Sequence, residues 1–248
     1  TNVMYVVQRP ASGNIGKLWK TTDGGSTWVQ LTIPAGTSSR MLVTTSPSDA
    51  DSLWIAYPGG ANGSKVFQSG DGGATWTRLM SYSSVTDIFG SNRQGWYDNV
   101  VSVDPTNKDK IYMGGVDLAT WDVVNGYRET AGTYDAPWNT NYVHADKHMI
   151  AWDMSTTPPT IIVGSDGGLH RSYDGRIWTP ISRGFVSLQL YNVAANELGH
   201  MTGGSQDNGT YLLNFSGNSF NGQPSKTGIS IYGGDGFDVE FSRFSPKT

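Results

Sequence analysis

Short apolar stretches alternate along the chain with turns rich in glycine, proline, aspartate and asparagine. The clearest case is residues 100–115, in which an apolar run ending at Val103, the turn at residues 104–107 and a second apolar run follow one another. Residues 42–56 and 150–164 repeat this order more weakly. Apolar runs of this kind, bounded by turn residues, predict β-strands joined in hairpins. No stretch shows the periodicity of an amphipathic helix, so we expect an all-β protein.

A second hairpin pattern repeats at regular spacing. The pattern is Ser/Thr-x-Asp-Gly-x-x-Thr-Trp, and it occurs in residues 20–28, 68–76 and, in a shorter form, 171–178. The first two aspartates lie 48 residues apart and the third follows 103 residues later, which fits one and then two periods of about 50 residues. Weaker copies at 114–122 and 203–211 continue the series. This period is typical of the blades of a β-propeller.

The aspartate and the tryptophan of each copy are expected to be structural. The glycine after the aspartate permits the positive φ of a tight turn, and the carboxylate can accept backbone N–H groups across it. The tryptophan ring can then cover the neighbouring strand pair. A calcium loop would need more carboxylates at alternating positions than these turns supply, so a metal or catalytic role is the less favoured alternative. The residues concerned are Asp23, Trp28, Asp71, Trp76, Asp174 and Trp178.

An upstream hairpin and an Asp-Gly hairpin together make a unit of four strands, which is one propeller blade. The chain then holds about five blade equivalents, and we expect residues 1–248 to form a single β-propeller region. Residues 2–8 and 233–246 look like strands that start and stop inside a blade. Because a propeller closes to remove its sheet edges, we expect the chain to be a fragment of a larger propeller or a partner to supply the rest.

Composition agrees with this fold and narrows the function. The chain has 32 glycines, 9 tryptophans and 12 tyrosines with 15% charged residues, which suits many short strands and tight turns. A net charge of −4 without a basic stripe argues against nucleic-acid binding. No apolar run is long enough for membrane insertion. There is no cysteine and hence no disulfide framework, and Thr1 in place of a methionine predicts a processed or incomplete N-terminus.

One group of residues could carry chemistry. His144, Asp146 and His148 alternate, and on a β-strand they would project from one face. Two histidines around a carboxylate favour either a metal or acid–base site or a polar strand edge held by His–Asp hydrogen bonds. The outer two would lie roughly 13 Å apart on a straight strand, too far to share one ion. We therefore expect no metal site and no cofactor, with calcium as the one ion that stays open.

Three aspartates, Asp98, Asp146 and Asp235, each precede a stretch that is expected to be the inner strand of a blade. Equivalent positions around a propeller axis would form an acidic ring at one mouth of its channel. Aromatic residues lie close to them in sequence, and carboxylates beside aromatic rings suit a cation or a carbohydrate. The alternative is that the aspartates cap turns and the aromatic rings fill the space between blades. The expected ligand-binding residues are Trp96, Tyr97, Asp98, Tyr142, His144, Asp146, His148 and Asp235.

Residues 125–141 form an insertion relative to the shorter blades. Tyr127, Tyr134 and Trp138 make it either a recognition loop or a surface excursion. The turns at 166–168 and 206–209 are expected to be structural, because their composition is that of ordinary turns.

The Ser/Thr-x-Asp-Gly turns resemble the Asp-box (BNR) repeat. With them, the hairpin at 100–115 and the segments 143–148, 164–168 and 204–210 resemble the propellers of the sortilin-like group and of the xyloglucan-cleaving glycoside hydrolases. The resemblance spans nearly the whole chain and implies a β-propeller, whereas Asp-box propellers include enzymes, receptors and assembly factors. Sialidases share the repeat, but this chain lacks their Arg-Ile-Pro signature, so a sialidase is not expected.

These observations favour a secreted or cell-surface propeller that acts as a binding or scaffolding module for a carbohydrate or protein ligand. The alternatives are a glycoside hydrolase acting on a β-glucan such as xyloglucan, and an assembly factor. The xyloglucanase resemblance implies two propellers with an active cleft between them and a pair of catalytic aspartates. Asp98 would be one of the pair, and no second carboxylate is identified, although glycoside hydrolysis needs two. The expected partners are the ligand and the remainder of the propeller or a second propeller domain, without nucleic acid.

Overall fold

The computed structural model describes residues 2–9, 16–35, 40–58, 63–81, 88–89, 94–135, 138–184, 188–214 and 228–242. Within these ranges the chain is mostly β-strand, and the one helical element is the short 3-10 turn η1 (Gln94–Trp96). Nothing helical in the part of the chain described here is long and apolar enough to cross a membrane. The chain divides into two compact units, residues 1–181 (the first unit) and 182–248 (the second unit). The expectation of a single propeller region over residues 1–248 stays a prediction.

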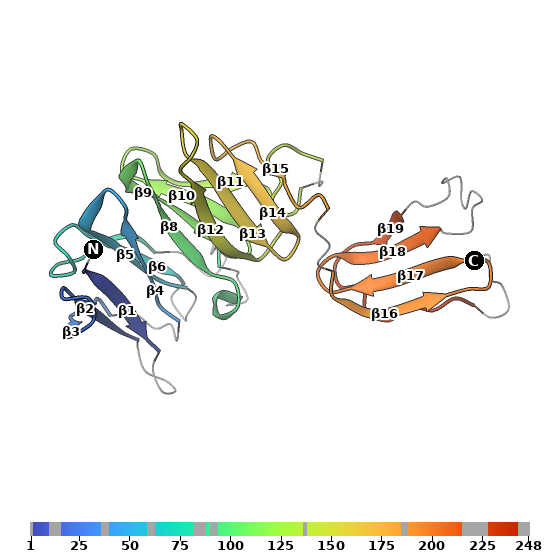
Figure 1. The fold of residues 1–248 in the computed structure, drawn as a ribbon, viewed down its shortest axis with the longest axis horizontal. Helices are drawn as coiled ribbons and strands as arrows, with labels where there is room; N and C mark the ends of the chain where they lie inside the picture. The colour runs from blue at the N-terminus through green and yellow to red at the C-terminus, as the bar shows by residue number, and fades with distance from the viewer. Residues whose placement is uncertain are drawn as a thin grey trace. The chain divides into compact units, whose positions relative to one another are not determined.

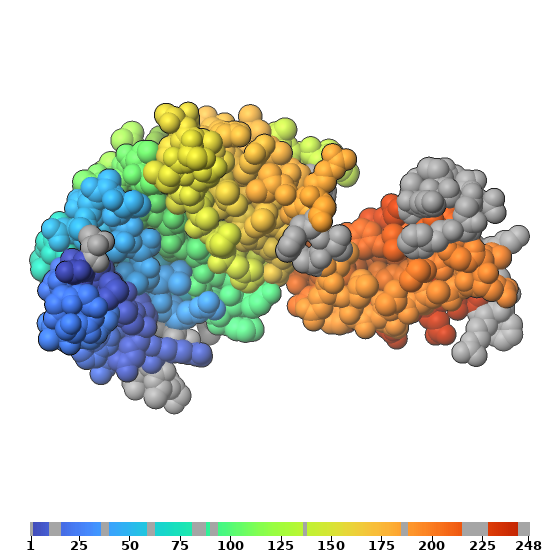
Figure 2. Space-filling model, in the orientation of Figure 1, coloured from blue at the N-terminus to red at the C-terminus, as the bar shows by residue number. Residues whose placement is uncertain are grey.

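The first unit consists of four antiparallel sheets that follow one another along the chain (Figure 1). Each sheet keeps its strands in sequence order, and the space-filling view in Figure 2 shows the same succession from blue through green to yellow. The first sheet has three strands and the other three have four. The strands are β1 (Met4–Gln8), β2 (Lys17–Thr21) and β3 (Val29–Leu31); β4 (Leu42–Ser46), β5 (Asp49–Tyr57), β6 (Lys65–Ser69) and β7 (Thr77–Ser81); β8 (Val100–Asp104), β9 (Asn107–Gly114), β10 (Leu118–Asp122) and β11 (Gly126–Ala131); and β12 (Lys147–Asp153), β13 (Thr160–Ser165), β14 (Gly168–Ser172) and β15 (Thr179–Pro180).

The hairpins expected from the apolar pattern open the second, third and fourth sheets. β8 pairs with β9, with Val100 opposite Gly114. The segments 42–56 and 150–164 form the β4–β5 and β12–β13 hairpins. In the β8–β9 turn, the Asp104 carboxylate accepts the Thr106 N–H at 2.9 Å, which is the turn chemistry that aspartate favours. The predicted strand–turn–strand organisation is therefore confirmed.

Neighbouring sheets of the first unit meet through the first strand of each. β1 contacts β4, β4 contacts β8, and β8 contacts β12. Buried apolar side chains fill the space between sheets, with Trp54 and Met113 in the cluster shared by the second and third sheets. Tyr112 and Ile161 belong to the cluster shared by the third and fourth. Because β8 and β12 are neighbours, the residues that precede these two strands can meet.

The Asp-Gly turns join the last two strands of a sheet, and their aspartates are bonded within the turn. Between β6 and β7, the Asp71 carboxylate accepts the Thr75 N–H at 2.8 Å and the Ser69 hydroxyl at 2.7 Å. The Ser69 hydroxyl in turn accepts the Gly73 N–H at 2.8 Å. The Thr75 hydroxyl and then its N–H hold the pKa of Asp71 at about 2, so this carboxylate is ionised and occupied by its own turn. The aspartates of the other two copies, bonded in the same manner, are Asp23 and Asp174.

Two of the three turn tryptophans cover the sheet that precedes their own. Trp76 Nε1 donates to Thr32 O at 3.1 Å, and Trp178 Nε1 donates to Thr130 O at 3.2 Å. Trp178 is only 3% exposed and belongs to the core between the third and fourth sheets. Trp28, in the first sheet, donates to a carbonyl of its own turn and is 38% exposed. The indoles therefore differ in how much they contribute to the packing between sheets.

The second unit is one antiparallel sheet of four strands in sequence order (Figure 1). Its strands are β16 (Leu190–Ala195), β17 (His200–Ser205), β18 (Gly209–Asn214) and β19 (Gly228–Tyr232). The segment after β19 is held to this sheet by the Gly236 N–H, which donates to Ser205 O at 2.8 Å. Phe237 also stacks on Tyr191, with ring centroids 5.0 Å apart. The weak repeat at residues 203–211 is thus the β17–β18 hairpin.

Candidate functional site

The candidate site lies in the first unit, where the segment before β8, the start of β12 and the β13–β14 turn come together. The Arg40 guanidinium fixes the first of these segments by donating to the backbone carbonyls of Trp96 and Tyr97. The β13–β14 turn is attached to the start of β12 by the Asp166 N–H, which donates to Asp146 O at 3.3 Å. The Tyr97 hydroxyl, which donates to Asp166 Oδ2, joins the segment before β8 to the β13–β14 turn.

Asp98 is the most unusual group of the site. Its side chain is 0% exposed, and neither carboxylate oxygen has a hydrogen-bond donor among the described residues. Its polar neighbour is a second carboxyl group, that of Asp146, and two carboxyl groups can bond to each other only if they share a proton. Burial, and after it the negative charge of Asp146, raise the pKa of Asp98 to about 8. At neutral pH the pair therefore holds a proton in place of a second negative charge.

Lys147 brings a buried positive charge to the same region. Its side chain is 0% exposed, and its Nζ donates to Val116 O at 2.6 Å and to Thr133 Oγ1 at 2.7 Å. Burial lowers the pKa of the Lys147 ammonium to about 8, against the opposing effect of nearby carboxylates. Those carboxylates are Asp117, Asp146, Asp98 and Glu129. The acidic groups around Lys147 thus outnumber its single positive charge.

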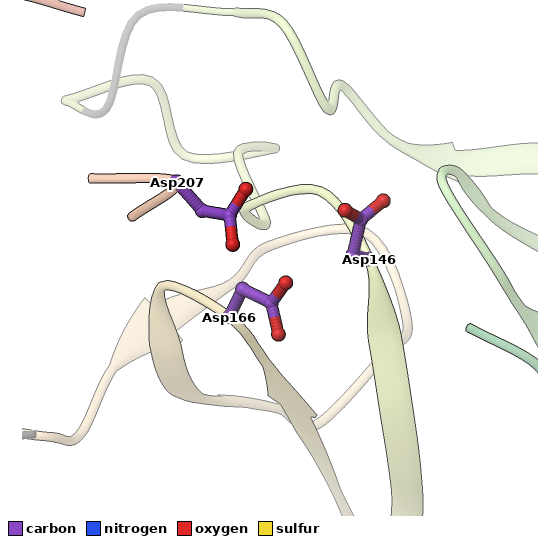
Figure 3. A group of neighbouring side chains, drawn as sticks. All are labelled: Asp146, Asp166 and Asp207. Atoms are coloured by element: carbon purple, nitrogen blue, oxygen red, sulfur yellow. The ribbon is translucent and has the colours of Figure 1, made fainter. Parts of the chain in front are cut away.

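Asp166, in the β13–β14 turn, joins the aromatic residues to the carboxylates. Its Oδ2 accepts the Tyr97 hydroxyl at 3.0 Å, and its Oδ1 accepts from His148 Nε2 at 2.8 Å. The Tyr97 and His148 rings meet edge to face with centroids 4.8 Å apart. Carboxylate oxygens of Asp146 and Asp166 lie within 4.8 Å of each other, and Figure 3 shows the two side chains at the start of β12 and in the neighbouring turn. Asp207, also labelled there, belongs to the second unit.

The Trp96 indole extends this network to the surface. It is 68% exposed, and its ring centroid lies 5.8 Å from that of Tyr97. Asp146 and Asp166 are partly exposed, so a ligand can reach them, whereas Asp98 is closed off. Chemically, the region offers apolar ring surfaces, an imidazole, and carboxylate oxygens that can accept hydroxyl groups or bind a cation. We define Trp96, Tyr97, Asp146, His148 and Asp166 as the aromatic–acidic strip.

The alternation of His144, Asp146 and His148 does not place them on one strand, and this expectation was wrong. β12 begins at Lys147, and Asp146 has a φ of 59°, so the chain turns between the two histidines. Aspartate adopts this left-handed conformation more readily than most residues. His148 belongs to the strip, whereas His144 packs against Gly167. A Cβ atom added to Gly167 would lie only 2.3 Å from the His144 imidazole.

Tyr142 and His144 are not part of the strip, and Tyr142 contacts a third histidine, His170. The Tyr142 ring contacts those of His144 and His170, with centroids 6.5 Å and 5.9 Å away. His170 is 4% exposed, and its Nδ1 has no hydrogen-bond partner in the described part of the chain. Burial, and then the positive charges of His144 and Lys147, lower the pKa of His170 to about 4. Its imidazole is therefore neutral at physiological pH.

Two of the three aspartates expected in the acidic ring, Asp98 and Asp146, lie in the first unit and interact with each other. Asp98 and Asp146, which precede β8 and β12, interact as equivalent positions on neighbouring strands should. Asp235 lies in the second unit after β19, where its carboxylate accepts the Asp207 N–H at 2.9 Å. A ring that includes Asp235 stays a prediction.

Comparisons with known proteins support the fold. No protein-family model matches the sequence, and no curated protein matches it. The GH74 xyloglucanase from Xanthomonas campestris matches with a TM-score of 0.52 at 21% identity, over 99% of this chain and 39% of that enzyme. The fold is that of a β-propeller. YCF48 from Cyanidioschyzon merolae has a TM-score of 0.44 at 16% identity, over 92% of this chain and 72% of its own. Sqt1 from Saccharomyces cerevisiae has a TM-score of 0.43 at 15% identity, over 87% and 56%.

Two residues of this propeller site were not predicted as functional from the sequence. Asp166 was interpreted as part of a structural turn, although a signal for it exists: Asp117, Asp166 and Asp207 each lie in the turn between the second and third strands of a sheet. In an antiparallel sheet that turn lies at the same end as the start of the first strand, where Asp146 lies. Lys147 carries no such signal, because lysine is mostly exposed in proteins and only the surrounding fold shows its burial.

The three aromatic residues of the insertion at 125–141 are exposed, with residues 136–137 outside the described ranges. Tyr127 is 40% exposed, Tyr134 83% and Trp138 84%. Their role in recognition stays a prediction.

Proposed function

We propose that this protein is a secreted or cell-surface β-propeller that binds a carbohydrate through the aromatic–acidic strip. The observation that carries the proposal is the continuity of the strip, in which the exposed indole of Trp96 leads through Tyr97 to the carboxylate of Asp166. A sugar ring has an apolar face of C–H groups and a rim of hydroxyl groups. An aromatic surface beside hydrogen-bond acceptors matches both features.

The charge of the site favours a neutral sugar over an anionic ligand. Asp146 and Asp166 would repel a phosphate or a carboxylate that approached the strip. The nearby ammonium of Lys147 does not offset this repulsion at the surface, because it is buried and donates to Val116 O and Thr133 Oγ1. Neutral polysaccharides, β-glucans among them, are therefore the ligand class that we propose.

We also propose that the chain belongs to the Asp-box (BNR) propellers and is related to the sortilin-like group. It is supported by the hydrogen bonds of the Asp-Gly turns, in which an aspartate accepts from a backbone N–H and a hydroxyl of its own turn, as Asp71 does. This bonding accounts for the residue types of the motif at their observed spacing.

Isothermal titration calorimetry with neutral glucan oligosaccharides, including xyloglucan fragments, tests the binding proposal. Trp96→Ala and Asp166→Asn should each weaken binding by about tenfold or more, because each removes one of the two kinds of contact. Tyr173→Ala is the matched control. Its ring is 57% exposed, but it lies in the β14–β15 turn, at the opposite end of the sheet from Asp166. Circular dichroism establishes that each variant is folded.

Two outcomes would contradict carbohydrate binding: no saturable binding of any oligosaccharide, or wild-type affinity in both strip variants. Binding of a protein or peptide that is lost in the same two variants would instead establish the protein-ligand alternative, and with it a scaffolding or assembly role.

Hydrolysis of a β-glucan such as xyloglucan is a second candidate function, favoured by the spacing of Asp146 and Asp166. Their carboxylate oxygens lie within 4.8 Å, close to the separation of about 5–5.5 Å between the two carboxyl groups of retaining glycosidases. Asp98, proposed from the sequence as a catalytic carboxylate, is 0% exposed and could act only through Asp146. Reducing-sugar release from xyloglucan that both Asp146→Asn and Asp166→Asn abolish is the expected result. No release from any β-glucan would exclude this activity.

A further inference from the structure

A polar cavity of about 570 Å³ lies in the first unit and shares no residue with the aromatic–acidic strip. Its volume is within the range of about 300–1,000 Å³ that is typical of sites for small ligands. The lining residues come from the third sheet, from the segment that follows β11 and from the turn between β14 and β15. The charged residues among them are Lys110, Asp122, Arg128, Glu129, Asp135, Asp174 and Arg176.

The strand register explains why polar side chains face this cavity. Tyr112, Thr120 and Arg128 lie opposite one another on β9, β10 and β11, so their side chains project from the same face of the third sheet. Lys110 and Asp122 are an opposed pair two residues further along β9 and β10, and they share that face. Because Tyr112 belongs to the apolar cluster between the third and fourth sheets, this face is the one that meets the fourth sheet, whose β14–β15 turn also lines the cavity.

Three of the four carboxylates of the cavity are bonded within their own segments of chain. Asp122 accepts the Asn125 N–H at 2.7 Å, and Asp135 accepts the Asn141 side-chain amide at 2.9 Å. Asp174 is bonded within its Asp-Gly turn. These groups therefore already have donors, and they do not need a ligand to supply them.

The two arginines of the cavity keep most of their donors unused. Among the described residues, the Arg176 guanidinium has no hydrogen-bond or ion-pair partner. Arg128 Nη2 donates to Asn125 Oδ1 at 3.4 Å, which is longer than the usual N–H···O distance of about 2.7–3.2 Å. Lys110 Nζ, by contrast, lies 3.4 Å from Asp104 Oδ2. A guanidinium has five N–H donors in a planar arrangement and can bind a carboxylate through two parallel hydrogen bonds, so these two side chains fit an acidic ligand.

We propose that this cavity binds an acidic saccharide, and that Arg128 and Arg176 bind the carboxylate of its uronate unit. A saccharide is favoured because hydroxyl and amide side chains make up much of the uncharged lining and can exchange hydrogen bonds with sugar hydroxyl groups. These side chains are Thr120, Asn125, Thr130 and Asn141. A singly charged carboxylate is favoured over a phosphate, because Glu129 also lines the cavity and would repel a doubly charged group more strongly.

Isothermal titration calorimetry of the 248-residue protein with cellobiouronic acid tests this proposal. Cellobiose is the matched neutral ligand, because the two disaccharides differ only in the carboxylate that replaces a hydroxymethyl group. Saturable binding of cellobiouronic acid is expected. It should weaken as NaCl is added, because salt screens the attraction between the guanidinium groups and the carboxylate.

Substitutions in the cavity should change the affinity in opposite directions. Arg128→Gln and Arg176→Gln should each weaken the binding of cellobiouronic acid by about tenfold, the effect of losing one hydrogen bond to a charged group, and should leave any binding of cellobiose unchanged. Glu129→Gln should strengthen the binding of cellobiouronic acid by about two- to fivefold, because it removes a repelling charge. Arg171→Gln, on β14 and outside the lining of the cavity, is the matched control with wild-type affinity expected. All four side chains are exposed, so the variants should fold, and circular dichroism establishes this.

Four results would overturn the proposal. One is the absence of saturable binding of cellobiouronic acid up to about 1 mM. Another is equal affinity for this ligand in the wild type and in both arginine variants, which would place the ligand elsewhere. Competition by inorganic phosphate at equal affinity would identify a general anion site. Arginine-dependent binding of a peptide through its terminal carboxylate, with no saccharide bound, would identify a peptide site.

The outcome for the aromatic–acidic strip is separate, because the two sites share no residue. Trp96→Ala and Asp166→Asn should leave the arginine-dependent binding of cellobiouronic acid unchanged. Binding of cellobiouronic acid that these two variants abolish and the arginine variants do not would assign the ligand to the strip and overturn this inference. Binding of cellobiouronic acid without binding of any neutral glucan would refute the proposed function and leave this inference standing.

Discussion

Stability at acidic pH should depend on His170. Its imidazole is 4% exposed, and its pKa is lowered from 6.5 to about 4 by burial and by the charges of His144 and Lys147. Above pH 6.5 both the folded and the unfolded state are neutral at this residue, so it makes no difference to stability. Between pH 6.5 and pH 4 the unfolded state binds more protons at this residue than the folded state does. The free energy of unfolding should therefore decrease as the pH is lowered from 6.5 to 4, and level off below pH 4. The difference of about 2.5 pKa units corresponds to a loss of about 3 kcal/mol.

His170→Leu removes the titrating group and keeps a side chain of similar volume. At pH 7.5 the free energy of unfolding should lie within about 1.5 kcal/mol of the wild-type value, the range for swaps that keep the volume. At pH 4.5 the variant should have gained about 2.5 kcal/mol relative to the wild type, because it escapes the loss due to the histidine. The other groups that face this position, Tyr142, His144 and Lys147, are unchanged in the variant.

Guanidinium unfolding followed by tryptophan fluorescence measures this difference in the relevant part of the chain, because all 9 tryptophans lie in the first unit. His200→Gln, in the second unit, is the control and should keep the wild-type pH dependence of the signal. The reasoning is refuted if the wild type and His170→Leu lose the same free energy of unfolding between pH 7.5 and 4.5.

Three further substitutions test the packing and the buried charges. Trp178→Ala should lower the free energy of unfolding by about 3–5 kcal/mol, because its indole is 3% exposed, whereas Trp28→Ala, at an indole that is 38% exposed, should cost about 1 kcal/mol; similar losses in denaturant titrations would contradict this. Lys147→Met should destabilise by about 3 kcal/mol, and Asp117→Asn should recover part of that loss in a double-mutant cycle; zero coupling energy would show that the two charges do not interact. Gly167→Ala should cost about 1–3 kcal/mol, since its Cβ atom would lie 2.3 Å from the imidazole that covers the turn, and a wild-type melting temperature would rule this out.

The fold could be predicted because its signals are local. Ser69, Asp71 and Thr75 bond to one another within a few residues, so the turn that they form is specified by the residue types alone. The apolar runs on either side give the strands, and the period of the motif groups the strands into sheets of four. Nothing in this inference requires knowledge of contacts between distant residues.

The site could be predicted only where a position recurs in the blade. Asp98 and Asp146 both precede the first strand of a sheet, and this equivalence led to the expectation that they lie close together. The prediction that His144 and His148 project from one face was wrong, because the alternation rule assumes an extended backbone and the backbone at Asp146 is not extended. Asp166 was not singled out, because aspartate next to glycine also makes ordinary turns.

The polar groups at the two ends of the first unit's sheets differ in a way that separates stability from binding. In the four-stranded sheets, strand order puts the turn between the third and fourth strands, which holds Asp71 or Asp174, at one end. It puts the start of the first strand, with the turn between the second and third strands, at the other. At the first end, Asp71 is bonded within its own turn. At the other, Asp98 is buried without a hydrogen-bond donor among the described residues, and Asp166 lies beside the partly exposed Asp146. A buried carboxyl of this kind is a poor way to stabilise a core, since an apolar residue of similar size would cost less. The end of the blade at which an aspartate lies should therefore predict its effect: substitutions of the aspartates in the Asp-Gly turns change the free energy of unfolding, whereas isosteric substitutions in the strip change the affinity for a ligand.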